Sequence, residues 1–158
     1  MSENEFDLVT YTKEHQNIVK SGIDDISKIL NGRDVEEKRS LLFCLDKYLD
    51  PYYGYNLPYF DDIMFLLQKR LFVEADKDVK DDILQLLTDY SRNSLDYLAD
   101  NIEMVEPELL EDAIYALELT YNQKYVPIFI KYEFHENPHV QVVAKEALTE
   151  LSKLNFDK

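Results

Sequence analysis

The stretch that decides the fold lies at positions 137–151 and reads NPHVQVVAKEALTEL. Its apolar residues recur at intervals of three and four, as they do on one face of an α-helix. Asn137 can cap such a helix, and Pro138 suits its first turn, where the missing N–H of a proline costs little. We therefore predict a helix that buries one apolar stripe, formed by Val140, Ala144, Ala147, Leu148 and Leu151.

The same spacing occurs at three earlier points of the chain. It begins at Val79 and at Leu109, and an earlier copy, with Leu42, Leu45 and Leu49, has Lys38 in its first position. The equivalent positions are 30 to 41 residues apart. The two central stripes are formed by Val79, Ile83, Leu86, Leu87 and Tyr90, and by Leu109, Ala113, Ala116, Leu117 and Thr120.

A second helix precedes each of these stripes. The expected segments are 15–30, 58–72, 95–102 and 125–132, and Asn31-Gly32 should end the first of them, with Gly32 free to adopt a positive φ. The last segment lies within Tyr125–Phe134 (YVPIFIKYEF), which alone would also suit a strand. Pro127 disfavours a central strand, and we predict a helix. Two helices per repeat indicate an all-α protein, an α-solenoid of about four stacked antiparallel helix pairs, in one domain spanning 1–158.

The final pair resembles a HEAT repeat. In that family a turn residue and a proline precede a valine, and an Ala-x-x-Ala-Leu series follows, as after Asn137-Pro138 here. The segment Val126-Pro127-Ile128 resembles the matching first helix, and Asp78-Val79 begins a weaker second copy. Where the family often has Arg after the valine, this chain has Lys80 and Gln141. The resemblance covers about 56–154 and implies a HEAT-like fold.

Composition excludes several classes of function. The chain has 17 basic and 32 acidic residues, a formal net charge of −15, which disfavours nucleic-acid binding. Three glycines cannot form a Gly-rich phosphate loop, and one cysteine cannot form an internal disulfide or a cysteine-rich zinc site. No apolar run has the length of a membrane span. We expect a cytoplasmic protein without cofactor, metal, membrane or nucleic-acid partner.

The acidity is concentrated in the middle of the chain. Residues 74–118 contain fourteen acidic and three basic side chains. If the helices that begin near Val79 and Leu109 are neighbours, the residues opposite their apolar stripes form one negative surface, suited to a cationic partner. The expected surface residues are Asp81, Asp82, Gln85, Asp89, Glu108, Glu111, Asp112, Tyr115 and Glu118.

An aromatic loop is the second candidate site. Residues 51–60 read PYYGYNLPYF, and aromatic loop residues make good interface anchors because they bring large area at low entropy cost. Tyr53 and Tyr55 are the candidate anchors. The alternative is a loop that folds over the core and buries two or three of its rings.

Three sequence features suggest chemistry that their context disfavours. His135-Glu136-Asn137-Pro138-His139 matches the HExxH zinc signature, but a proline between the histidines disfavours the continuous helix that this site needs. Cys44 lies between apolar neighbours and is predicted to be a small core residue. His15 lies in a polar stretch and is expected to be solvated.

These features favour a binding protein over an enzyme. Small, strongly acidic cytosolic proteins resemble the immunity proteins of bacterial toxin systems, which cover the cationic active site of a basic toxin, often a nuclease. That resemblance implies a basic toxin domain as the partner. The alternatives are a scaffold or adaptor in a larger complex, and a helical-repeat enzyme such as a lyase or hydrolase.

Overall fold

The computed structural model describes residues 9–53, 57–92 and 94–156. These ranges form α-helices joined by short 3₁₀ helices and turns, and they contain no strand, which confirms the all-α prediction. The α-helices are α1 (Lys13–Ser21), α2 (Ile23–Leu30), α3 (Val35–Leu49), α4 (Phe60–Leu71), α5 (Lys77–Tyr90), α6 (Asp96–Asp100), α7 (Pro107–Glu118), α8 (Val126–Tyr132) and α9 (Pro138–Phe156). The 3₁₀ helices are η2 (Pro51–Tyr53), η3 (Ile102–Met104) and η4 (Gln123–Tyr125).

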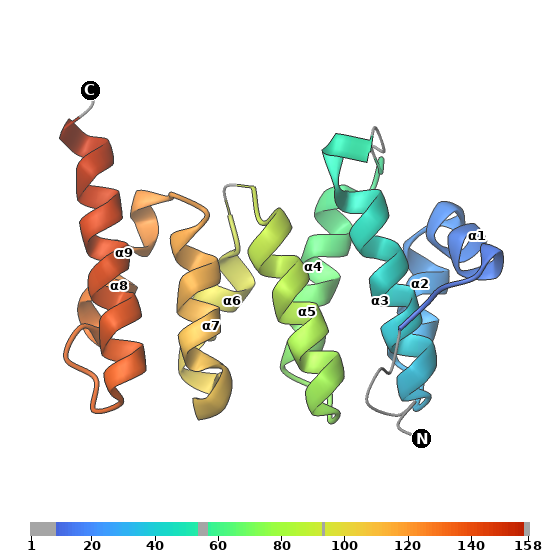
Figure 1. Ribbon diagram of the computed structural model, residues 1–158, viewed down its shortest axis with the longest axis horizontal. Helices are drawn as coiled ribbons and strands as arrows, with labels where there is room; N and C mark the ends of the chain where they lie inside the picture. The colour runs from blue at the N-terminus through green and yellow to red at the C-terminus, as the bar shows by residue number, and fades with distance from the viewer. Residues whose placement is uncertain (1–8, 54–56, 93, 157–158) are drawn as a thin grey trace, which may run out of the picture.

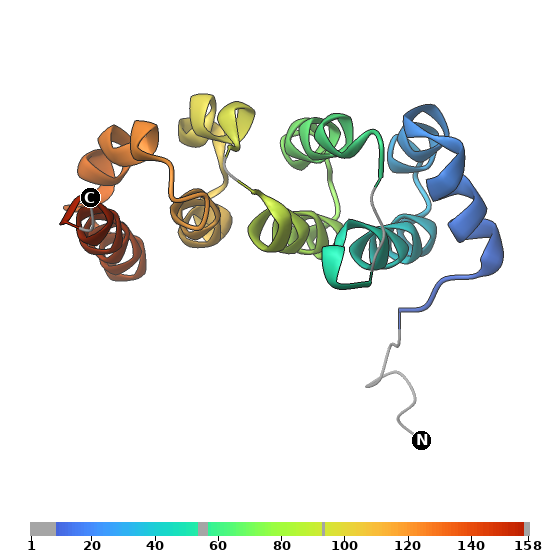
Figure 2. The same cartoon turned by 90° about the horizontal axis from the view of Figure 1, so that it is seen from above.

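The helices lie in two layers along an elongated molecule. Helices α3, α5, α7 and α9 form one layer, in which each packs against the next, and they run in the same direction (Figure 1). Helices α2, α4, α6 and α8 form the other layer, which Figure 2 shows behind the first. The first layer therefore presents a row of parallel helices along one side of the molecule.

Local sequence signals explain where these helices begin. The side chain of Asp76 accepts a hydrogen bond from the N–H of Val79 at 3.1 Å, and Asp34 caps α3 in the same way through Glu37. Asn137 accepts from the N–H of His139 at 2.9 Å at the start of α9. The ambiguous aromatic segment is a helix, α8, with Pro127 in its first turn.

The first predicted helix is broken. Helices α1 and α2 are separated by Gly22, whose φ of 127° lies in a region that favours glycine. The prediction placed the positive φ at Gly32, which was wrong: among the described glycines only Gly22 adopts it. Apolar spacing continues through residues 15–30 and does not report a bend of the backbone, so one helix was predicted where two exist.

His15 corrects another expectation. Its side chain is buried, not solvated: Nδ1 caps the start of α1 by accepting from the N–H of Thr12 at 3.0 Å, and Nε2 contacts the carboxylate of Glu37 on α3. This polar contact therefore joins α1 to α3.

The buried apolar side chains form a single cluster in the described part of the chain, and a group of ionic side chains lies within it. Lys38, which interrupts the apolar stripe of α3, is buried and donates to both oxygens of Glu74 at 2.9 and 3.1 Å. Arg70 and the N–H of Asp76 also donate to Glu74. Burial raises the pKa of Glu74, but these hydrogen bonds and the charges of Lys38 and Arg70 outweigh it and hold the pKa below its ordinary value. The cluster connects α3 with the loop between α4 and α5.

Candidate functional site

Three hollows follow one another across the α3–α5–α7–α9 layer. The α3–α5 groove, of about 230 Å³, is lined by Val9, Arg39, Leu42, Phe43, Asp46, Asp82, Gln85, Leu86 and Asp89. The α5–α7 groove, of about 380 Å³, is lined by Lys77, Asp81, Leu84, Gln85, Thr88, Glu108, Asp112 and Tyr115. The α7–α9 groove, of about 270 Å³, is lined by Glu111, Asp112, Tyr115, His139, Val142, Val143 and Glu146. Shared residues make the three grooves contiguous.

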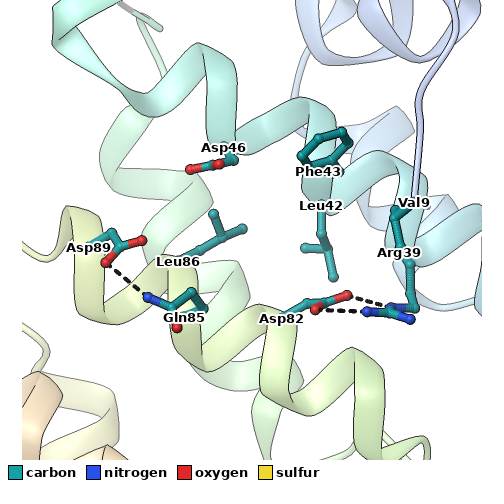
Figure 3. Close-up of a pocket in the computed structure, with 9 residues that line it drawn as sticks. All are labelled: Val9, Arg39, Leu42, Phe43, Asp46, Asp82, Gln85, Leu86 and Asp89. Atoms are coloured by element: carbon teal, nitrogen blue, oxygen red, sulfur yellow. Dashed lines mark hydrogen bonds and ion pairs between the residues drawn. The ribbon is translucent and has the colours of Figure 1, made fainter. Parts of the chain in front are cut away.

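The α3–α5 groove carries its own counter-charge. The guanidinium of Arg39 donates to both carboxylate oxygens of Asp82 across the groove, at 2.7 and 3.3 Å (Figure 3). Asp89 accepts a hydrogen bond from the uncharged amide of Gln85 at 3.0 Å and forms no ion pair with a described residue. On the α3 side, Asp46 accepts from the hydroxyl of Tyr90 at 2.5 Å. The exposed carboxylate of Asp89 is thus more available to an outside cation than that of Asp82 is.

The negative charge of the α5–α7 groove is partly neutralised by one lysine. Lys77 donates to Asp81 at 3.2 Å, one helical turn away on α5, and both side chains are largely exposed. Such a surface pair is worth only a few tenths of a kcal/mol, about 0.3–0.5, so an outside cation can compete for Asp81. Glu108 and Asp112 lie on the α7 side and are exposed.

The α7–α9 groove has no lysine or arginine among its described lining residues. Glu111 and Asp112 come from α7, and Glu146 comes from α9. Tyr115 lies between this groove and the previous one and is 44% exposed. The ring of Tyr115 therefore stands beside carboxylates on both of its sides.

Glu118 departs from the predicted surface. It was expected to point outward, but its side chain is buried, and its Oε1 has no hydrogen-bond partner among the described residues. Burial raises the pKa of this carboxyl, and the charges of Glu146 and Glu150 on α9 raise it further. The prediction failed because α9 packs against α7 and brings Glu146 and Glu150 close to Glu118.

The other eight predicted surface residues all line the three grooves. Together the grooves contain eight carboxylates, two permanent cations and a histidine, a net charge of −6 with that histidine neutral. We call this contiguous surface the acidic face. Its carboxylates are Asp46, Asp81, Asp82, Asp89, Glu108, Glu111, Asp112 and Glu146, and its cations are Arg39 and Lys77.

Sequence reasoning missed the two flanks of this face. Arg39, Phe43 and Asp46 follow one another on α3 at helical spacing, and His139, Val142 and Glu146 do so on α9. The prediction considered only the segment with the greatest excess of acids. Continuing the outward positions of the repeat into both neighbouring helices would have found these residues.

Some side chains of the aromatic loop are buried and others are exposed. Leu57 and Phe60 are buried, Tyr59 is half-buried with its hydroxyl inside, and the guanidinium of Arg92 lies 3.6 Å from the centre of the Phe60 ring. Tyr52 is 90% exposed. Of the two candidate anchors, Tyr53 is the last residue of η2, and the structure describes its backbone but not its side chain. Tyr55 lies outside the described residues. The last part of the loop thus belongs to the core.

The HExxH segment adopts a turn and a helix start. The ring Nδ1 of His135 accepts from the N–H of Asn137 at 3.0 Å, and Pro138 begins α9, so the two histidines do not share one continuous helix. Within the described residues, no group of three or more His, Cys, Asp or Glu side chains is placed to hold a metal ion. Cys44 is buried, as predicted, and burial raises the pKa of its thiol to about 11.

Comparison with known proteins identifies no relative. The chain matches no family model, no curated protein and no solved structure. No helix of the described part of the chain combines the length and apolarity that crossing a membrane requires.

Proposed function

We propose that this protein is a binding protein whose acidic face docks a basic protein partner. In this proposal the chain is a HEAT-like α-solenoid of about four helix pairs, and the row α3, α5, α7 and α9 is its binding surface. The most specific form is an inhibitor of the immunity-protein type, which covers the cationic active site of a toxin domain.

One observation carries the proposal: three contiguous grooves collect eight carboxylates on one face of the row, against two cations. Acidic side chains that served only solubility would not need to converge on hollows. A surface with this excess of negative charge attracts cationic partners and accelerates their association, by roughly 10–10³-fold. Phe43, Tyr115 and Val142 add exposed apolar area among the carboxylates, as a protein interface requires.

An adaptor role is the second candidate, and a separate observation favours it. The last helix pair exposes several large apolar side chains, with Phe134 at 75% and Ile130 at 52%. An exposed apolar end repeat is expected of a unit that stacks on another protein. Sedimentation of the purified chain over a range of concentrations tests this: end-to-end assembly that Phe134→Ser abolishes would favour the adaptor.

The acidic face is tested by neutralising four of its carboxylates that form no ion pair with a described residue. In the test variant Asp89, Glu108, Glu111 and Asp112 become the corresponding amides. In the control variant Asp24, Asp61, Asp100 and Glu136, which are exposed and line none of the grooves, are changed in the same way. Both variants have the same net charge, so a difference between them reports location.

The measurement is the association rate of the partner protein at low and high salt. The candidate partner is the product of the gene next to this one, tested first for toxicity that co-expression of this chain relieves. The test variant should associate at least about tenfold more slowly at low salt than the control variant. Equal loss in both variants, or no loss in either, would contradict a specific acidic docking face.

A further inference from the structure

The two ends of the helix row differ in how they are covered. At one end α1 packs against both α2 and α3. The exposed side chains of α1 are all polar: Lys13, Glu14, Asn17, Lys20 and Ser21. At the other end lie α8 and α9, and no described element packs beyond them (Figures 1 and 2). The last helix pair is therefore open on its outer side.

Large apolar side chains are exposed at this open end. Phe134, directly after α8, and Ile130, one helical turn earlier, are each more than half exposed. The Nζ of Lys145 on α9 lies 5.5 Å from the centre of the Phe134 ring. Lys145 is exposed and is not among the α9 residues that line the α7–α9 groove, so this contact lies on the side of α9 away from that groove. We call Ile130, Phe134, Lys145 and the half-buried Leu148 the end patch.

The end patch lies in the part of the chain that has no net charge. Residues 119–158 contain five basic and five acidic side chains, so the whole acidic excess lies in residues 1–118. Lys145 itself forms no ion pair with a described carboxylate. Two copies of a chain with a net charge of −15 repel each other least when they meet at this end, because their acidic parts are then farthest apart.

The surface that matches the end patch is the end patch of another copy. A head-to-tail contact would place it against α1 and α2, where no large apolar side chain is exposed in the described part of the chain. Contact between two like patches covers apolar surface on both sides and has two-fold symmetry. It also brings opposite charges together, because Glu136 is exposed two residues after Phe134 and can face the Lys145 of the other copy.

We propose that two copies of this chain associate through their end patches and form a closed dimer with two-fold symmetry. The contact buries Ile130 and Phe134 of both copies. It leaves the acidic face of each copy open, because the end patch lines none of the three grooves. The inference goes beyond the proposed function and does not depend on it. A closed dimer also differs from an adaptor that stacks on another protein, since its assembly stops at two copies.

Sedimentation equilibrium of the full chain measures the assembly over about 1 µM to 1 mM, the range of weak association. The test variants are Phe134→Ser and Ile130→Ser. The matched controls are Val73→Ser and Met104→Ser, at exposed apolar residues that lie outside the end patch. All four side chains are more than half exposed, so circular dichroism should show an unchanged helix content in every variant.

We expect a monomer–dimer equilibrium that saturates at two copies. Each test variant should raise the dissociation constant of the dimer by at least about tenfold, because one substitution removes an apolar side chain from both halves of the contact. The control variants should leave the dissociation constant unchanged. Monomers at every concentration, growth beyond two copies, or equal losses in test and control variants would overturn the proposal.

Charge reversal tests whether like ends meet. Lys145→Glu makes the end more acidic and Glu136→Lys makes it more basic, so copies of either variant should repel their own kind and dimerise more weakly. An equimolar mixture of the two variants should dimerise again, because each contact then joins opposite charges. A head-to-tail contact gives no such rescue. A mixture that is no more dimeric than either variant alone would therefore overturn the two-fold arrangement.

Salt separates this outcome from that of the proposed function. High salt screens the repulsion between two acidic chains and should strengthen the dimer, whereas it should slow the association of a basic partner with the acidic face. A dimer that salt weakens would be held by charge and would overturn the apolar contact. Phe134→Ser should abolish the dimer and leave the association rate of the partner unchanged, so either inference can fail while the other stands.

Discussion

Arg39 on α3 and Asp82 on α5 form a bidentate ion pair across the first groove of the acidic face, at 2.7 and 3.3 Å. Each side chain is more than two-thirds covered. The hydrogen bond and charge of Asp82 raise the pKa of the Arg39 guanidinium despite its partial burial. The pair both joins two neighbouring helices of the row and removes one carboxylate from the set that a partner can use.

Removing Arg39 should therefore strengthen the attraction of the face for cations. In Arg39→Gln, Asp82 becomes available and the net charge of the grooves falls by one. We expect the association rate of a basic partner at low salt to rise by about two- to fivefold, and the difference to vanish at high salt, because screening removes long-range steering.

Arg33→Gln is the matched control, since Arg33 is exposed between α2 and α3 and lines none of the grooves. It changes the net charge of the chain equally and should raise the rate less. A slower rate in Arg39→Gln would mean that Arg39 itself contacts the partner, which is incompatible with a purely acidic docking face.

The buried pair of Lys38 and Glu74 predicts a large effect on stability. Their side chains are 5% and 1% exposed. Lys38→Met removes the donor of two hydrogen bonds to Glu74 and leaves that carboxylate buried. The free energy of unfolding should therefore fall by about 3–5 kcal/mol. Denaturation in urea measures the loss.

The double variant Lys38→Met/Glu74→Gln is the informative companion. It removes both charges while the amide of Gln can still accept from the N–H of Asp76. We expect it to be more stable than Lys38→Met alone, because in the single variant the buried carboxylate of Glu74 keeps only Arg70 as a counter-charge. If the double variant were the less stable of the two, the ion pair would be contributing net stability.

Two carboxyl groups should give the stability of this protein opposite dependences on pH. The pKa of Glu74 is depressed by folding, so its contribution is present above the unfolded pKa and is lost as pH falls through the folded pKa. The pKa of Glu118 is raised by folding. Its destabilising effect is therefore absent at low pH, where the group is protonated in both states, and appears as pH rises from the unfolded pKa through the folded pKa.

Glu118→Gln isolates the second effect. Relative to the unchanged protein, this variant should become progressively more stable between acidic and neutral pH, since Gln has no charge to bury. Glu136→Gln should show no such trend, because Glu136 is exposed. Urea midpoints measured from pH 4 to 8 test both variants. Parallel curves for Glu118→Gln and the unchanged protein would show that folding does not raise the pKa of Glu118.

The helices were predictable from sequence because each apolar stripe is a local pattern. Val79 and Val140 lie in stripes whose period alone specifies which face is buried. The partner of Lys38 was not predictable, since Glu74 lies 36 residues away and only the packing of α3 beside the loop before α5 brings them together. The sequence shows that Lys38 is a charged residue within an apolar stripe. The stripe does not indicate which acidic residue pairs with that charge.

The candidate site was predictable to the same extent. Eight outward residues of α5 and α7 follow from helical phase, and the structure brings them to contiguous grooves. Glu118 has the same phase as those residues, and its burial depends on the neighbour, because the flank of α7 that it occupies is covered by α9. Helical phase specifies a direction from the helix axis, whereas exposure also depends on which helices pack alongside.

Tyr115 allows a test of whether the acidic face is an interface or only a charged surface. Its ring lies between two grooves and is 44% exposed, so Tyr115→Ala removes contact area without opening the core. For an interface centred on this face, Tyr115→Ala should weaken partner binding by about 1–2 kcal/mol and act mainly on dissociation, whereas the charge variants act mainly on association. Tyr121→Ala, at a tyrosine that is 54% exposed and lines none of the grooves, provides the control. Binding kinetics that are identical for the two alanine variants would show that the partner contacts the carboxylates without covering α7.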